Sequence, residues 1–205
     1  EAKYEGDLNT AITLNSHLGV LSSFSPRVTD KEKDIENIFL ANIDPDIQMR
    51  FLSQMRRPRL VGLDSMNYWI QSKRPSLLKA LKMADIFLAN EGEARQLTGE
   101  NDLLKAAAAL KKMGPPMIVI KKGEHGVMFC GEKLDFPLPA YPVENIADPT
   151  GAGDTFAGGF MGCLARAGKI DRHTLKKAIA CGTVAASFNV EHLGVDRSDA
   201  LTADS

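Results

Sequence analysis

Cysteine is scarce and scattered in the sequence of 205 residues, which has three: Cys130, Cys163 and Cys181. No two of them have the close spacing of a metal-binding or redox motif. An odd number cannot close into pairs, which argues against a secreted disulfide scaffold. The four histidines show no spacing typical of zinc ligands. We therefore expect a reducing, cytoplasmic location and buried, inert thiols.

An excess of one charge and long apolar runs are also lacking. The 25 Lys and Arg residues balance 26 Asp and Glu, which gives a formal net charge of −1. Nucleic-acid surfaces usually carry a strong basic excess, so we expect no nucleic-acid partner. No apolar run approaches the ~20 residues needed to span a bilayer, and the first residues lack the features of a signal peptide. We therefore expect no membrane partner.

Short apolar runs alternate with helical patterns along most of the sequence. Asp44 and Pro45 form a typical helix start, and Gly114 a typical stop. This alternation predicts an α/β fold with a mostly parallel sheet covered by helices on both faces. The expected strands lie near 38–43, 60–63, 86–89, 117–120, 127–129 and 134–138, and the main expected helices near 75–83, 91–98, 101–113, 152–167 and 173–190.

The most specific feature is the run DPTGAGDTFAGGF at residues 148–160. Gly151 and Gly153 would let a ligand approach the backbone closely, and a helix that begins here would direct its unpaired N–H groups at an anion. The carboxylate of Asp154 would repel that anion, and its presence makes sense if it removes a proton from an attacking hydroxyl group. The alternative is a tight turn in which Asp154 only caps the helix.

This run closely resembles the C-terminal signature of the ribokinase/PfkB family of carbohydrate kinases. The resemblance implies a ribokinase-like fold and an ATP-dependent phosphotransferase that acts on a hydroxyl of a sugar or nucleoside. It implies ATP and Mg²⁺ as cofactors, and a homodimer formed through a small β lid. Asp154 would be the general base, and backbone N–H groups would hold the moving phosphoryl group: those of Gly151, Ala152, Gly153 and Asp154.

Residues 84–94, ADIFLANEGEA, resemble the family's NxxE segment. The resemblance implies that Asn90 and Glu93 help to hold Mg²⁺, often through water. Taken alone, the same spacing is also that of an ordinary helix start with Glu in the first turn.

Residues 117–126, MIVIKKGEHG, resemble the family's strand and glycine loop beside the nucleotide. Gly123 and Gly126 would let ribose and phosphates lie near the backbone, and Lys121 would face phosphate. The alternatives are a plain hairpin turn and a solvated lysine.

Three further residues are assigned through the resemblance. Asn189 lies at the end of the last long helix, where the family packs adenine; its alternative role is a helix C-cap. Asp148 and Thr150 match positions that bind a monovalent cation such as K⁺ in some family members.

The resemblance covers residues 38–195 and divides the chain into two parts. Residues 1–28 are expected to be a remnant of the substrate lid, and residues 29–205 the catalytic α/β domain. The family's N-terminal glycine-pair signature, with its sugar-binding Asp and Asn, has no counterpart in this sequence. We therefore expect these 205 residues to be part of a longer protein and to be inactive alone.

Two other functions stay open at this point. One is a noncatalytic ribokinase-like module that binds a nucleotide or a partner. The other is a dinucleotide-binding oxidoreductase, although GxGxxG does not follow a first strand in this sequence. The sequence does not identify the acceptor among sugars and nucleosides.

Overall fold

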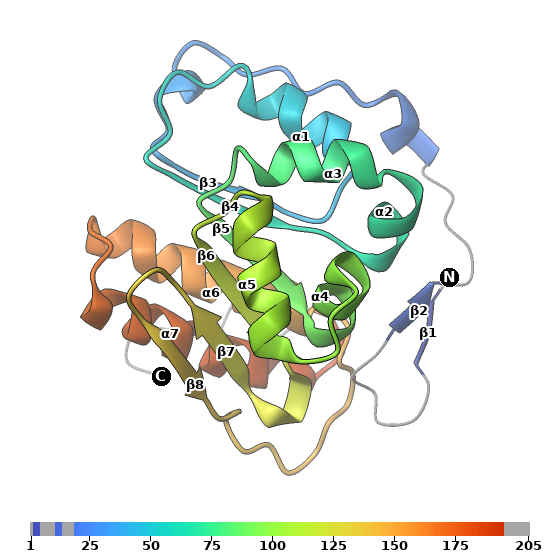
Figure 1. Cartoon of the computed structure of the whole chain (residues 1–205), viewed down its shortest axis with the longest axis vertical. Helices are drawn as coiled ribbons and strands as arrows, with labels where there is room; N and C mark the ends of the chain where they lie inside the picture. Colours follow the sequence, from blue (N-terminus) through green and yellow to red (C-terminus); the bar gives the residue numbers. More distant parts are fainter. Residues whose placement is uncertain (1, 5–10, 14–18, 195–205) are drawn as a thin grey trace. The chain divides into compact units, whose positions relative to one another are not determined.

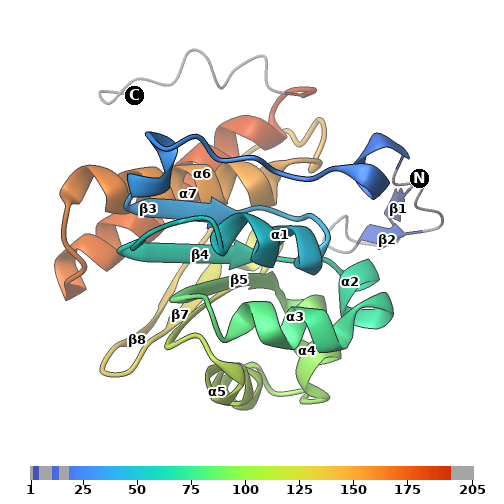
Figure 2. The same ribbon diagram turned by 90° about the horizontal axis from the view of Figure 1, so that it is seen from above.

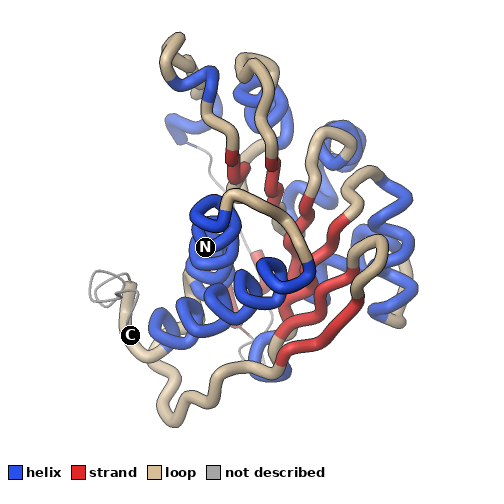
Figure 3. The backbone as a smooth tube through the Cα atoms, turned by 90° about the vertical axis from the view of Figure 1, so that its left-hand side faces the viewer, coloured by secondary structure: helices blue, strands red, loops and turns tan. Residues whose placement is uncertain are grey.

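The computed structural model describes residues 2–4, 11–13 and 19–194. Strands, loops and helices alternate along this part of the chain (Figure 3). Six strands form one sheet in the order β3-β4-β5-β6-β7-β8. Their bounds are β3 Asn37–Leu40, β4 Leu60–Asp64, β5 Ile86–Asn90, β6 Met117–Lys121, β7 Val127–Cys130 and β8 Asp135–Leu138. The predicted α/β fold and each predicted sheet strand are confirmed.

The backbone separates into two compact units. The first comprises Glu1–Ile120 and Phe129–Lys133, and the second comprises Lys121–Met128 and Leu134–Ser205. The helices of the first unit are α1 Pro45–Leu52, α2 Asn67–Ser72, α3 Arg74–Leu81, α4 Glu91–Thr98 and α5 Leu103–Met113. The helices of the second unit are α6 Ala152–Ala167 and α7 Arg172–Val190. Short 3₁₀ turns occur at Gly19–Ser23 and Glu32–Asp34 in the first unit and at Gly123–His125 in the second.

The core of the first unit is built on parallel strands. β3 pairs with β4, and β4 pairs with β5, both in parallel. All five residues of β4 are buried, and Leu63 and Phe87 are fully buried on neighbouring strands. Helices α3, α4 and α5 lie together on one side of these strands (Figures 1 and 2). Burial on both faces explains why the strands are continuous apolar runs rather than alternating patterns.

The helix boundaries follow the capping chemistry. Asp44 accepts a hydrogen bond from the backbone N–H of Asp46 and precedes Pro45, as predicted. Asp102 accepts one from the backbone N–H of Lys105 and so begins α5. At the C-terminal end of α4, Gly99 has a φ of 76°, a left-handed conformation that glycine adopts without steric cost.

Helix α2 was not predicted. Residues Asn67–Ser72 form this helix, which lies between the strand and the helix that the sequence predicts. No side chain caps this helix at Met66, so the usual sequence signal for a helix start is missing. The helix is held instead by burial of Trp69, whose Nε1 donates to Asn42 Oδ1 at 3.1 Å.

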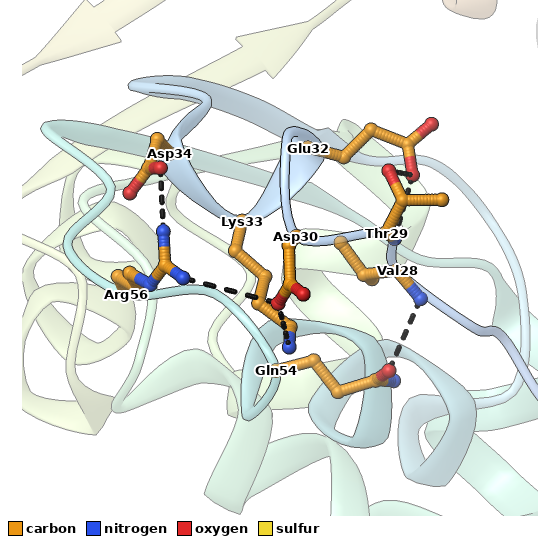
Figure 4. A network of polar contacts seen from close by, with 8 residues as sticks. All are labelled: Val28, Thr29, Asp30, Glu32, Lys33, Asp34, Gln54 and Arg56. Atoms are coloured by element: carbon orange, nitrogen blue, oxygen red, sulfur yellow. Dashed lines mark hydrogen bonds and ion pairs between the residues drawn. The ribbon is translucent and has the colours of Figure 1, made fainter.

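Polar contacts hold the segment before β3 against the end of α1 (Figure 4). The backbone N–H of Val28 donates to Gln54 Oε1 at 3.2 Å, and Arg56 Nη1 donates to Asp34 Oδ2 at 2.6 Å. Lys33 lowers the pKa of the exposed Asp30 carboxyl through a hydrogen bond, and its ammonium lies 2.8 Å from Asp30 Oδ1. These surface contacts fix the path of the chain into the sheet.

In the second unit, α6 and α7 pack side by side (Figures 1 and 2). Glycine makes this close approach possible at two positions. A Cβ built on Gly159 would lie 3.0 Å from the Cys181 carbonyl oxygen, and one on Gly182 would lie 2.7 Å from the Phe156 carbonyl oxygen. The two backbones therefore touch directly, and we call this contact the glycine seam.

The N-terminal part contains a small antiparallel pair, β1 (Ala2–Tyr4) with β2 (Ala11–Thr13). Of the expected lid remnant at residues 1–28, the structure describes residues 2–4, 11–13 and 19–28. The division into a lid remnant at 1–28 and a catalytic domain at 29–205 stays a prediction. Within the part of the chain that the structure describes, no helix has the length and apolar character required to cross a membrane.

Candidate active site

The loop that leads into α6 is a tight turn. The backbone N–H of Ala152 donates to the Pro149 carbonyl at 3.2 Å, and that of Thr155 donates to the Gly151 carbonyl at 2.8 Å. Gly151 occupies the N-cap position with a φ of 83°. This left-handed conformation is rare for residues with a Cβ, so the turn requires glycine at this position. The helix therefore begins where the motif predicted.

The first turn of α6 presents backbone donors. Among the described residues, no acceptor pairs with the backbone N–H of Gly153 or of Asp154. Lys121 extends to the same place: its Nζ would lie 3.0 Å from a Cβ built on Gly153. Unpaired N–H groups, the positive end of the helix dipole and an ammonium group together make a site suited to an anion. Ala152, also predicted to donate, instead uses its N–H within the turn.

Asp154 lies in this first turn, and its side chain is exposed. A carboxylate here stabilises the helix N-terminus, but it also repels any anion bound by the neighbouring N–H groups. An exposed carboxylate beside an anion site can accept a proton from a hydroxyl group that attacks the bound anion. The geometry thus allows both the helix-capping and the general-base interpretation.

Asp148 and Thr150 build the turn before the glycines. The backbone N–H of Thr150 donates to Asp148 Oδ1 at 2.9 Å, and this hydrogen bond holds the pKa of the Asp148 carboxyl below its usual value. The Thr150 carbonyl accepts from the Asn189 side chain. Both residues are thus engaged within the protein, and their role in binding a monovalent cation stays a prediction. Over the described ranges, no group of three or more His, Cys, Asp and Glu residues could hold a metal ion.

The predicted glycine loop forms the turn between β6 and β7. The backbone N–H of Lys122 donates to the Gly126 carbonyl at 2.8 Å, and that of Gly126 to the Gly123 carbonyl at 3.0 Å. Gly126 is buried with a φ of 81°, and a Cβ there would collide with the backbone of Leu138, Pro139 and Ala140. The turn itself therefore requires this glycine. Contact of Gly123 and Gly126 with a nucleotide stays a prediction.

Asn90 and Glu93 lie in the first unit, where β5 passes into α4. Asn90 Oδ1 accepts from the Glu93 backbone N–H at 2.8 Å, and Glu93 Oε2 accepts from the Asn90 backbone N–H at 2.8 Å. This reciprocal pair is a capping box. The ordinary helix start that the sequence left open is therefore present, and a metal role would be additional to it.

Asn189 lies beside the loop at the start of α6, and its predicted contact with adenine stays a prediction. It is 4% exposed, and both polar atoms of its side chain are bonded to the loop at the start of α6. One of its partners is the hydroxyl of Thr155, which the sequence analysis did not single out. No local signal could have identified Thr155, because its partner lies 34 residues away along the chain.

Comparisons with known proteins identify relatives of this chain. The model of the pfkB family carbohydrate kinases matches residues 58–202. Cytidine kinase from Thermococcus kodakarensis is 32% identical over 142 residues, which are 68% of this chain and 51% of that protein. Aminoimidazole riboside kinase from Salmonella typhimurium is 31% identical over 132 residues, which are 62% of this chain and 41% of that protein. The chain thus spans about half the length, or less, of these relatives.

Solved structures show the same fold. The nucleoside kinase of Methanocaldococcus jannaschii, a ribokinase-family member, superposes with a TM-score of 0.68 at 20% identity, over 90% of this chain and 58% of that one. Aminoimidazole riboside kinase from Salmonella enterica superposes with a TM-score of 0.65 at 24% identity, over 75% and 56%. The predicted ribokinase-like fold is confirmed, and the family model covers most of the chain. The chain belongs to the pfkB family of carbohydrate kinases.

Proposed function

We propose that the protein transfers the γ-phosphoryl group of ATP to a hydroxyl group of a sugar or a nucleoside. This proposal rests on the start of α6. There the backbone N–H groups of Gly153 and Asp154 and the ammonium group of Lys121 lie close to the exposed carboxylate of Asp154. The relatives named above phosphorylate nucleosides according to their names, which supports the acceptor class.

Each group at the start of α6 has a distinct role in this proposal. Asp154 takes the proton from the acceptor hydroxyl as its oxygen attacks the γ-phosphorus. The N–H groups of Gly153 and Asp154, with Gly151 and Ala152 forming the loop, stabilise the charge on the moving phosphoryl group. Lys121 neutralises phosphate charge. Because transfer depends mainly on alignment and charge, no covalent intermediate with the protein is needed.

A divalent cation belongs to the same proposal. The carboxylate and amide oxygens of Glu93 and Asn90 are ligands of the kind that Mg²⁺ prefers, and Mg²⁺ usually keeps several waters. Such an ion, when bound, neutralises the negative charge of the ATP phosphates. A monovalent cation at Asp148 and Thr150 and a dimer formed through the lid remain parts of the proposal.

The proposal is tested on the protein purified from its intact coding sequence. Mg–ATP binding is measured by calorimetry, and ADP formation is measured with a panel of sugars and nucleosides. We expect ADP formation that depends on one acceptor class. ATP binding without ADP formation on any acceptor would instead support the noncatalytic module. Binding of NAD in place of ATP would support the oxidoreductase.

Glu93→Gln separates the capping and metal roles of the NxxE segment. Glutamine at this position also forms a capping box, so we expect little change in the free energy of unfolding. If Glu93 holds Mg²⁺ through water, the Mg²⁺ concentration for half-maximal activity should rise about 10–100-fold.

The matched control is Glu91→Gln, which removes the same charge from the first turn of α4, where Glu91 pairs with Arg95 at 3.0 Å. We expect its Mg²⁺ dependence to equal that of the unmodified protein. An unchanged Mg²⁺ dependence in Glu93→Gln would restrict Glu93 to the helix cap.

A further inference from the structure

One buried amide spans the phosphate-binding loop, which we define as residues 148–155. Asn189, on the last turn of α7, donates from Nδ2 to the Thr150 carbonyl at 2.9 Å. Its Oδ1 accepts from Thr155 Oγ1 at 2.8 Å. These two partners lie on either side of the segment that presents the Gly153 and Asp154 N–H groups. A single side chain therefore ties the beginning of the loop to the first turn of α6.

The neighbouring residue holds the chain just before the loop. The Val190 carbonyl accepts from the backbone N–H of Ala147 at 2.8 Å and from that of Asp148 at 3.2 Å. A Cβ built on Gly151 would lie 3.5 Å from Asn189 Oδ1, so the loop backbone passes directly over this amide. The end of α7 thus contacts residues 147–155 through four hydrogen bonds made by two consecutive residues.

Burial makes these contacts specific. Asn189 is 4% exposed, and a buried amide is costly unless both its donor and its acceptor are paired. The Thr150 carbonyl requires a donor and the Thr155 hydroxyl an acceptor, and an amide supplies both from one side chain. An apolar residue of similar size would remove both hydrogen bonds and would let the loop shift.

We propose that Asn189 is a positioning residue that sets the location of the phosphate-binding loop, and that it does not contact the nucleotide base. This inference rests on the proposed kinase function. Asn189 acts through the Gly153 and Asp154 N–H groups and the Asp154 carboxylate, whose alignment with the reacting phosphoryl group depends on where the loop lies. Misplacement of such groups by about 1 Å can lower a rate by about 10²-fold.

The test compares Asn189→Leu with substitutions of its partner. For Asn189→Leu and Thr155→Val, which remove hydrogen bonds at nearly constant size, we expect kcat to fall by about 10–100-fold. Thr155→Ser keeps the hydroxyl group and should restore most of the activity. Because both apolar variants break the same hydrogen bond, their effects should not add in the double variant. Thr183→Val, which removes a hydroxyl that donates to the Ile179 carbonyl within α7, is the matched control.

Two readouts separate positioning from base contact. We expect the ratio of kcat/KM for ATP to that for GTP to stay unchanged in Asn189→Leu, whereas a lost base contact would alter it. We also expect faster hydrogen–deuterium exchange in the peptide covering residues 147–156. Unchanged kcat and exchange in the variants, or a changed nucleotide preference, would overturn the inference.

The exchange measurement also distinguishes the two proposals. If the unmodified protein phosphorylates no acceptor but the exchange of residues 147–156 rises in Asn189→Leu, the kinase proposal fails and the positioning of the loop by Asn189 is supported. Should Asn189→Leu not fold, the pair Thr155→Val and Thr155→Ser decides the question through kcat and the same exchange.

Discussion

Asp154→Asn is expected to lower kcat by about 10²–10⁴-fold while the affinity for Mg–ATP changes little. Asparagine keeps the size and shape of the side chain but cannot accept the proton of the acceptor hydroxyl. Binding should persist because the N–H groups of the first turn and Lys121 are unaltered. The measurements are steady-state ADP formation and ATP calorimetry on the same preparation.

The capping interpretation of Asp154 makes a different prediction. Loss of a charge at a helix N-terminus costs about 0.3–1 kcal/mol of stability and would leave turnover of the folded protein intact. Asp171→Asn is the matched control, because Asp171 caps α7 through the backbone N–H of Thr174 and lies outside the loop. Turnover near that of the unmodified protein in Asp154→Asn would remove Asp154 from the role of base.

Gly153→Val should abolish nucleotide binding and turnover together. A Cβ at this position would lie 3.0 Å from Lys121 Nζ, so a branched side chain must push the ammonium group aside and cover the N–H donors. Loss of one such donor typically lowers kcat by about 10²–10³-fold, and here several groups are disturbed at once. Calorimetry with Mg–ATP should show no measurable binding.

Folding should not account for this loss. Gly153 is not among the glycines with positive φ, and valine costs no more than glycine in a helix. Gly158→Val is the control on the same helix, since a Cβ there meets nothing within 4 Å. We expect it to bind ATP normally. ATP affinity in Gly153→Val equal to that of this control would mean that the loop is only a turn.

The elements that could be predicted from sequence are those with local signals. The strands are apolar on both faces, as at Leu63 and Phe87, and several helices begin at side-chain caps such as Asp44 and Asp102. Helix α2 lacks such a cap and is stabilised by the burial of Trp69, which depends on residues distant in sequence. Its existence therefore could not be read from the local pattern.

The candidate site shows the same division. The turn at Gly151 and the start of α6 follow from the motif, because a left-handed glycine and a helix start are local properties. The approach of Lys121 to Gly153 and the bonds from Asn189 to Thr150 and Thr155 join residues more than 30 positions apart. Such contacts depend on how β6, α6 and α7 pack, which no local pattern specifies.

The glycine seam has a mechanical consequence for the loop. At Gly159 and Gly182 the backbones of the two helices approach each other closely, so α6 resists sliding or turning about its axis unless α7 follows. The hydrogen bonds from Asn189 and Val190 fasten the same pair of helices at the loop end. We therefore expect a displacement that a ligand produces at Gly153 to move both helices together.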